Sequence, residues 1–337
     1  MLNELTNETH TPTPSPPAFD PALDGDDLEF RAIFHPLGFA IEIATNRPEV
    51  LEAAAELWGF TSPLRECPVA QIRILVSGSS STECPPGPTY NCQRHLVTLI
   101  ADSDNYATCD LRASFGFARI THATLRHRLY LQYHFLEAMA LGILSAINAP
   151  ALHAACVSLH DQGFLLCGPS GAGKSTLSYA CARAGFVYTT DDASYLLRQA
   201  DHPRVVGQSH KIRFRPHGRQ LFPELQGRTL TPRMEGKPSI EVPTAELRIH
   251  TAEEVPIHHL VLLDRQFSGK ASIEYCATSI AIERLQEGLY PTLDIRQEQI
   301  SAMRILENLP TWKLRYSRLD EAIDCLRSLT GAKGYNA

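Results

Sequence analysis

The chain has 337 residues, of which 44% are hydrophobic and 20% are charged, a balance typical of a soluble globular protein with one large or two modest domains. The net charge is −6, and residues 1–30 contribute seven acidic residues without a Lys or Arg. This pattern lacks the basic stripe of a nucleic-acid-binding protein, so we expect no nucleic-acid partner.

Cysteine usage and apolar stretches indicate a cytoplasmic protein. Nine cysteines, an odd number without a Cys-x2-Cys pair, argue against a zinc site and against a disulfide framework. The first residues carry no basic stretch followed by an apolar run, so we expect no signal peptide. The most apolar stretch, residues 136–152, is interrupted by Asn148 and Pro150, and we expect no membrane span.

The first part of the chain divides into a tail and a small domain. Residues 1–30 are acidic and rich in proline, and such a segment buries too little apolar surface to fold, so we predict a disordered tail. Residues 31–150 predict a smaller α+β domain that ends in a long helix. Its expected elements are paired strands in 31–45, a helix in 48–60, strands at 71–77 and 94–102 with a loop at 78–92 between them, further strands in 108–122, and a helix over 125–148 buried between two layers.

Residues 151–337 predict a mixed α/β nucleotide-binding domain. The pattern reads strand, tight turn, strand, glycine-rich loop, helix and strand, in that order. The expected elements are strands at 151–160 and 164–168, a helix at 174–185 that ends at Gly185, a strand at 186–190, a strand at 258–264 and alternating helices and strands from 279 onward.

The segment GPSGAGKST fits the phosphate-binding pattern G-x-x-x-x-G-K-[ST]. Its glycines let the backbone turn tightly and bring N–H groups to the phosphates, while the helix that follows adds donors and its dipole. Lys174 supplies a positive charge for the β- and γ-phosphates, and the Ser175 hydroxyl suits the shell of Mg2+. The predicted nucleotide-binding residues are Gly168, Pro169, Ser170, Gly171, Ala172, Gly173, Lys174, Ser175 and Thr176.

Two segments compete for the role of the carboxylate beside the metal. Asp191 and Asp192 end a short apolar strand sixteen positions after Ser175, and Asp264 ends the apolar run at 260–263. A pair at one strand end suits phosphorylation of a hydroxyl, since one carboxylate holds metal and the other accepts the proton. His153, on the preceding strand, lies near the phosphate end of the sheet if the two strands pair.

The strand LHAACVSL, the turn, FLLCGPSGAGKST, the helix and the double aspartate together resemble the C-terminal domain of HPr kinase/phosphorylase. They are more closely similar to the bacterial HPr-kinase-like serine kinases, which include kinases of lasso-peptide pathways. The resemblance implies a fold similar to that of PEP carboxykinase, with ATP and Mg2+ as cofactors, and it is compatible with a homo-oligomer. It also implies that Asp191 is the base toward the hydroxyl, that Asp192 holds metal and that His153 lies near the base.

The segment that follows the acidic pair departs from the family, because its glycine-rich signature is not legible in residues 214–243. The resemblance therefore does not extend to HPr as the acceptor or to phosphorylase activity. Basic residues fill this region instead, and a mobile basic loop there would steady the transferring phosphoryl group. Arg213 and Lys237 are the candidates for that role.

The leading hypothesis is an ATP-dependent, Mg2+-dependent kinase that acts on a serine-type hydroxyl of a peptide or small molecule, with Asp191, His153, Lys174, Arg213 and Lys237 as catalytic residues. One alternative is a regulatory ATPase without a phosphoacceptor, in which Asp264 is the metal-associated residue. Another is a scaffold that binds nucleotide for stability alone.

Overall fold

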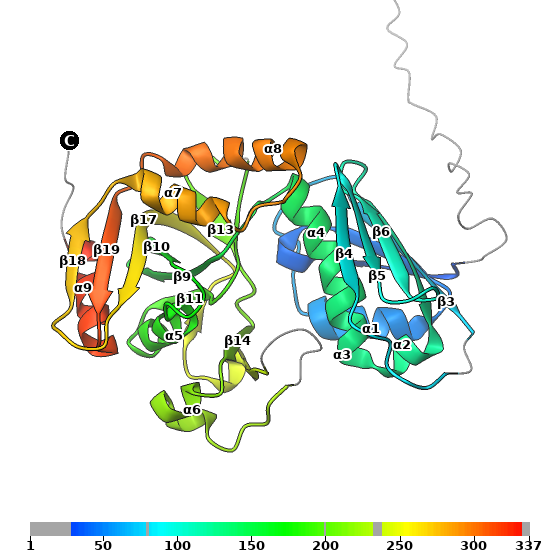
Figure 1. Ribbon diagram of the computed structural model, residues 1–337, viewed down its shortest axis with the longest axis horizontal. Helices are drawn as coiled ribbons and strands as arrows, with labels where there is room; N and C mark the ends of the chain where they lie inside the picture. Colours follow the sequence, from blue (N-terminus) through cyan, green and yellow to red (C-terminus); the bar gives the residue numbers. More distant parts are fainter. Residues whose placement is uncertain (1–27, 79–80, 199, 232–237, 332–337) are drawn as a thin grey trace, which may run out of the picture.

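A computed structural model of the chain describes residues 28–78, 81–198, 200–231 and 238–331 as a mixed α/β protein with three sheets. Two parts lie side by side, one built by the first half of the chain and one by the second (Figure 1). The predicted boundary near residue 150 lies between the last helix of the first part and the first strand of the second. Within the described residues, none of the helices is long and apolar enough to cross a membrane.

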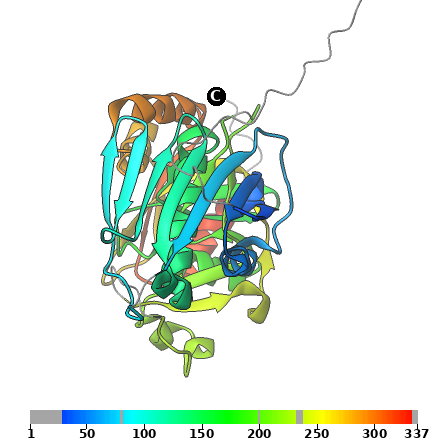
Figure 2. The ribbon, with the colours of Figure 1, turned by 90° about the vertical axis from the view of Figure 1, so that its right-hand side faces the viewer.

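A seven-stranded sheet dominates the first part, and Figure 2 faces it. Its strands follow the order β1-β2-β3-β7-β6-β5-β4, and helices pack against one of its faces. The elements are β1 (Phe30–Phe34), β2 (Ile41–Thr45), α1 (Pro48–Trp58), β3 (Ala70–Ser77), β4 (Thr89–Gln93), β5 (Leu96–Ile100), β6 (Tyr106–Asp110), β7 (Phe115–Thr121), α2 (His122–Arg126), α3 (Arg128–Tyr130), η2 (Leu131–Glu137) and α4 (Ala138–Ile147).

The expected paired strands, helix and later strands of this part are confirmed, with two corrections. The tail was predicted to reach residue 30, but Leu28 is buried against Ala44 and β1 already begins at Phe30. β4 lies inside the predicted loop, and it escapes a pattern search because it is a mostly exposed edge strand without apolar alternation. Residues 1–27 of the predicted tail lie outside the described residues.

The long helix expected over 125–148 is a helical run in several segments. His127 has φ −93° and ψ 70°, which interrupts the run, and η2 is a π-helical stretch before α4. The dense apolar positions do bury as expected, because α4 shares a core with the seven-stranded sheet and with Tyr195, Leu197 and Val206 of the second part. This run thus forms the wall between the two parts (Figure 1).

The second part is a mixed sheet with helices on both faces. α5 and α9 pack on one face, and α7 with the segment after α8 packs on the other. The elements are β8 (Ala151–Leu152), β9 (Ala154–Leu159), β10 (Gln162–Cys167), α5 (Lys174–Arg183), β11 (Val187–Thr190), β12 (Ser194–Leu196), β13 (Arg204–Val206), β14 (Lys211–Phe214), α6 (Gly218–Leu221), β15 (Ile240–Pro243), β16 (His250–Thr251), β17 (Glu254–Arg265), β18 (Ser272–Tyr275), α7 (Thr278–Gln286), α8 (Leu293–Met303), β19 (Thr311–Tyr316) and α9 (Leu319–Gly331).

The predicted strand 151–160 divides at His153. β8 pairs with β12, whereas β9 pairs with β10 and β11, so the chain changes partners at this residue. The expected turn, the strand before the glycine-rich loop, helix α5 and strand β11 are confirmed. Gly185 has φ +95° just past the end of α5, the left-handed conformation that favours glycine there.

Candidate active site

One edge of the second sheet collects most of the predicted functional residues. β10 and β17 run parallel, and β9 runs antiparallel between β10 and β11. The carboxyl ends of β10, β11 and β17 and the amino end of β9 therefore meet at the same edge. This topology brings together the glycine-rich loop, Asp191, Asp192, His153 and Asp264, and it makes the edge a ligand-binding position typical of α/β sheets.

The glycine-rich loop, residues 168–176, joins β10 to the start of α5. Gly171 and Gly173 have φ +87° and +96°, values that side chains other than glycine adopt with strain. A Cβ on Gly173 would also stand 2.5 Å from the Tyr316 hydroxyl, which itself donates to the Ala172 carbonyl over 3.1 Å. The Leu177 N–H donates to the Gly173 carbonyl, so the helix begins directly at the loop and leaves its first N–H groups facing outward.

Lys174 is folded back over this loop and is only 6% exposed. Its ammonium donates to the carbonyls of Gly168 and Pro169 over 2.8 and 3.3 Å, and to His153 Nε2 over 3.0 Å. Burial lowers the pKa of Lys174. These contacts leave a cation next to the N–H groups of the loop, where an anionic phosphate would find both kinds of partner.

His153 connects Lys174 to Asp192. Its Nδ1 lies 3.2 Å from Asp192 Oδ1, and its Nε2 accepts from the Lys174 ammonium. Both contacts are satisfied by the neutral imidazole with its proton on Nδ1, a tautomer assigned from these partners. Burial, and next the positive charge of Lys174, lower the pKa of His153, which favours the same neutral form.

The two aspartates differ sharply in their surroundings. Asp191 is 7% exposed, and its carboxylate accepts from the Tyr188 hydroxyl over 3.1 Å and from the Arg213 N–H over 3.3 Å. Burial, and next the charge of Asp192, raise the pKa of Asp191 to about 6. The side chain of Asp192 is 60% exposed to solvent, and it lies beside His153. One carboxylate is thus buried and more easily protonated than an ordinary aspartate, while the other is open to solvent.

Ser175 ties the start of α5 to the end of β11. Its hydroxyl donates to the Asp191 carbonyl over 3.4 Å. The interval between the loop and the acidic pair is short because β11 follows α5 directly in the chain. Hydroxyl and carboxylate oxygens are suitable ligands for Mg2+, which usually binds one or two carboxylates together with substrate phosphates. Ser175 and Asp192 thus supply oxygens of the kind that Mg2+ binds. Among the residues that the structure describes, no group of three His, Cys, Asp or Glu side chains is arranged to hold a metal without a substrate.

Asp191 opens into a recess of about 100 Å³ between the two parts of the chain. Its walls combine charged, amide and apolar groups: Glu137, Leu141, Thr190, Asp191, Asp192, Ala193, Tyr195, Gln208, Lys211 and Arg213. Two of these residues, Glu137 and Leu141, come from the helical run of the first part.

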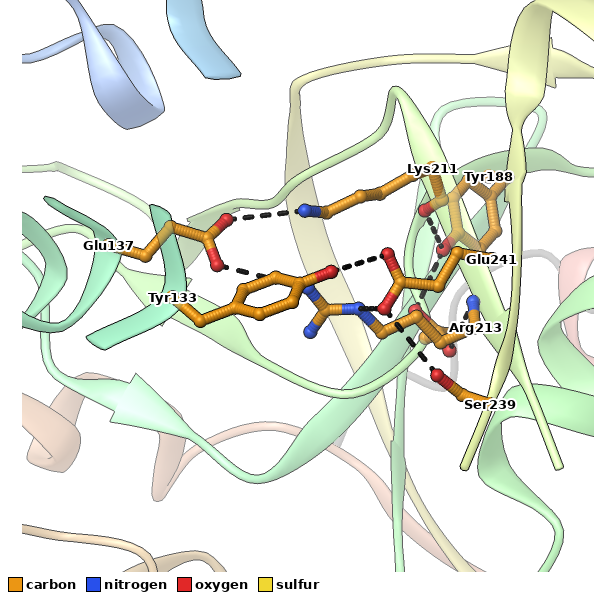
Figure 3. Close-up of polar contacts among 8 residues, drawn as sticks. Tyr133, Glu137, Tyr188, Lys211, Arg213, Ser239 and Glu241 are labelled. Atoms are coloured by element: carbon orange, nitrogen blue, oxygen red, sulfur yellow. Dashed lines mark hydrogen bonds and ion pairs between the residues drawn. The ribbon is translucent and has the colours of Figure 1, made fainter. Parts of the chain in front are cut away.

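Sequence reasoning missed a group of polar residues that lines and adjoins this recess (Figure 3). Lys211 Nζ lies 3.2 Å from Glu137, and the Tyr133 hydroxyl donates to Glu241 over 2.8 Å. Glu137 is the only Asp, Glu, Lys or Arg residue in the apolar stretch 136–152, which is the signal that would have singled it out.

The structure places Arg213 on a strand and not on the predicted mobile basic loop, and it does not test the prediction for Lys237. Arg213 lies on strand β14, with its guanidinium 3.3 Å from Glu241 and 3.9 Å from Glu137, so its cation is already held by acids. Lys237 lies outside the described residues.

Asp264 stands at the same edge but in a different environment. Its carboxylate is 3.1 Å from Lys313 and 3.4 Å from Arg315, and the Gln266 amide donates to it over 2.6 Å. The hydrogen bond from Lys313 is the main cause that lowers the pKa of Asp264. A carboxylate with two cationic partners is a poorer metal ligand than Asp192, since the metal would have to displace them.

Two further recesses flank the glycine-rich loop. One, of about 370 Å³, borders Gly168 and Pro169 and reaches Asp264, Arg284 and Lys313. The other, of about 270 Å³, borders Gly173 and Thr176 and lies at the ends of β17 and β19, with Arg265, Tyr316, Ser317, Arg318 and Leu319 among its walls. Both lie on the side of the loop away from β11.

Fold and site together define a mixed α/β protein whose glycine-rich loop, lysine and paired carboxylates meet at one strand edge. No protein-family model and no curated protein matches the sequence. Among solved structures the chain is similar to the Hpr(Ser) kinase/phosphatase from Coxiella burnetii, with 13% identity over 53% of this chain and 95% of that one, and with a TM-score of 0.32. Because this TM-score is low, the proposals below rest on the geometry of this chain.

Proposed function

We propose that the chain is an ATP-dependent kinase that transfers the γ-phosphoryl group to a serine-type hydroxyl of a peptide or small molecule, with Mg2+. We also propose that residues 151–337 form a P-loop nucleotide-binding domain of the HPr-kinase class and that residues 31–150 form a smaller α+β domain. The observation that carries the proposal is Asp191, a buried carboxylate with a raised pKa at the same strand edge as the phosphate-type loop.

The donor phosphates would lie on residues 168–176. The N–H groups of the loop and of the first turn of α5 supply hydrogen bonds, and Lys174 supplies positive charge. The Lys174 ammonium would leave the Gly168 and Pro169 carbonyls and bind the phosphates instead. Its contact with His153 would keep it near the loop. Ser175 and Asp192 would hold Mg2+, which neutralises phosphate charge when bound.

Transfer requires a base for the acceptor hydroxyl. The hydroxyl oxygen forms a bond to the γ-phosphorus, the bond from that phosphorus to the bridging oxygen breaks, and ADP leaves with the bonding electrons. The hydroxyl proton passes to Asp191, whose raised pKa makes it a better acceptor than an ordinary aspartate. Tyr188 and the Arg213 N–H hold the carboxylate in place for this step.

The regulatory ATPase stays the alternative, since Asp264 also lies beside the loop. Its ion pairs with Lys313 and Arg315 count against it as the metal ligand, and they support the choice of Asp191 and Asp192. The nucleotide-binding scaffold is the other alternative, and the intact set Lys174, Ser175, Asp191 and Asp192 counts against it.

The proposal is tested by acceptor-dependent transfer from γ-labelled ATP with Mg2+. The acceptors are free serine, small hydroxy compounds and serine-containing peptides. Each is compared with a counterpart that lacks the hydroxyl, in which alanine replaces serine or hydrogen replaces the hydroxyl group. We expect label in at least one hydroxyl acceptor and in none of the matched controls. Release of free phosphate at the same rate with and without every acceptor would contradict the kinase and favour the ATPase.

A further inference from the structure

Strand β14 belongs to neither of the large sheets. It pairs only with β15, in a two-stranded antiparallel ribbon from Lys211↔Pro243 to Phe214↔Ile240. A two-stranded ribbon is marginal in water unless something packs against it, so side-chain contacts must hold this one in position.

The two faces of β14 meet different parts of the molecule. Ile212 and Phe214 are buried in the core under α5, while Lys211 and Arg213 alternate with them and point toward the helical run of the first part. The first face fixes the ribbon to its own half of the chain. The second face fixes it to the other half.

Glu137 and Tyr133 together contact both strands of the ribbon (Figure 3). Glu137, whose side chain is only 10% exposed, pairs with Lys211 and Arg213 on β14 over 3.2 and 3.9 Å. Tyr133 donates its hydroxyl to Glu241 on β15, and its ring lies 5.9 Å from the Lys211 ammonium and 5.7 Å from the Arg213 guanidinium. A buried carboxylate with two cationic partners is costly to leave half-paired, so these contacts hold the ribbon against the first part.

Strand β14 contacts one oxygen of Asp191 directly and the other through Tyr188. The Arg213 backbone N–H donates to Oδ2, and the Tyr188 hydroxyl of β11 lies 3.1 Å from both Oδ1 and the Lys211 carbonyl, two acceptors that share its one proton. A shift of β14 would therefore move the carboxylate directly. Glu137 also forms part of the wall of the recess into which Asp191 opens.

We infer that the site at Asp191 is shared between the two parts of the chain, with Glu137 and Tyr133 as positioning residues that hold Asp191 through β14. The catalytic consequence rests on the proposed kinase function; the positioning itself does not. The acceptor group that enters this recess is small and polar, because the room is about 100 Å³ and the walls carry charges of both signs.

Amide hydrogen exchange of the full-length chain tests the positioning without an acceptor. We expect Glu137→Gln to speed exchange in peptides covering 211–214 and 188–192 by about tenfold or more, because the ribbon loses its buried acid. Tyr133→Phe, the milder variant, should do the same to a smaller degree. Glu298→Gln is the control, since Glu298 also joins the two parts, through ion pairs with Arg112 over 3.5 Å and Arg198 over 3.6 Å, but lies outside the recess.

Kinetics of labelled-ATP transfer to free serine, small hydroxy compounds and serine-containing peptides provide the second test. Glu137→Gln should lower kcat by about 10- to 100-fold while KM for ATP stays within about twofold, because the loop that binds ATP is untouched. Glu137→Asp should recover part of the loss, and Glu298→Gln should keep wild-type kcat.

Unchanged exchange at 211–214 and 188–192 in Glu137→Gln would overturn the inference, whatever the activity. Parallel loss of ATP binding and transfer in that variant would also overturn it, because damage would then extend beyond the acceptor side. If the wild-type chain transfers nothing while the exchange contrast holds, the proposed function fails and the positioning stands.

Discussion

At the scale of single residues, Gly173 is the position at which the loop tolerates least change. We expect Gly173→Ala to lower the free energy of unfolding by about 2 kcal/mol or more, because strain at positive φ adds to a clash with the Tyr316 hydroxyl. Chemical denaturation measures this. Gly269→Ala is the control, since Gly269 also has positive φ but a Cβ there would meet nothing within 4 Å. Equal losses in the two variants would contradict the clash.

His259 should make the fold sensitive to acid. Its Nδ1 accepts from the Trp312 N–H over 3.2 Å, its Nε2 faces the Gln162 side-chain oxygen, and burial lowers its pKa from 6.5 to about 4. A histidine whose pKa is lower in the folded state stabilises the fold fully above pH 6.5, and this contribution is lost as the pH falls from 6.5 toward 4.

We therefore expect the free energy of unfolding to fall more steeply between pH 6.5 and 4 in the wild type than in His259→Gln, which gains no charge. The difference should be on the order of 1 kcal/mol after solvent screening. Urea denaturation at several pH values measures it, and parallel curves for the two proteins would refute the assignment. His210, whose pKa is also lowered to about 4, leaves a residual slope in both.

Whether a site residue could be predicted depended on how far along the chain it lies from its partners. The loop, the acidic pair and His153 could be found because they lie within one short stretch whose strand, turn and helix pattern is local. Tyr133 and Glu241 are 108 positions apart, and no local pattern reports which buried polar groups will meet after the halves pack. Arg213 was chosen for its charge, but its position on β14 gives its backbone N–H the direct contact with Asp191.

At the scale of elements, the strand order places the proposed base and the proposed nucleoside site on opposite sides of the glycine-rich loop. Asp191 follows β11 on one side of the loop, and the recess at the ends of β17 and β19 lies on the other side. That recess borders Gly173 and Thr176 on the α5 side of the loop, so it is the better position for the nucleoside of the donor.

We expect Arg265→Ala to weaken ATP binding roughly tenfold, the equivalent of about 1.4 kcal/mol, because the variant removes a side chain from the wall of the recess proposed for the nucleoside. The thermal shift of the protein across an ATP titration measures it. Lys313→Ala is the matched control in the recess beside Gly168. A tenfold loss in Lys313→Ala with none in Arg265→Ala would assign the nucleoside to that recess instead.

The departures from the predicted elements have different physical causes. β4 is exposed on most of its length, so no apolar alternation marks it. The run that was expected as one helix over 125–148 breaks at His127 and at η2, and its apolar periodicity does not mark these breaks. The division at His153 arises because one stretch of apolar residues serves two sets of partner strands, which only the assembled sheet decides.

At the scale of the whole molecule, the two parts are joined by polar contacts at the recess and by a shared apolar core along α4. Composition and pattern predicted two parts, but no sequence pattern indicated that the first would supply a wall of the recess. The role of the first part is thus an inference from packing, and it gives a reason for the acidic residue Glu137 at the end of η2, directly before the apolar helix α4.

The most direct test of the central claim compares Asp191→Asn with Asp264→Asn in the labelled-ATP transfer assay. Both variants make the same isosteric change at the same strand edge. The account predicts that Asp191→Asn keeps ATP binding but loses transfer by 100-fold or more, since the base is removed, while Asp264→Asn transfers within a few-fold of wild type. Undiminished turnover in Asp191→Asn together with its loss in Asp264→Asn would contradict the account and identify a regulatory ATPase.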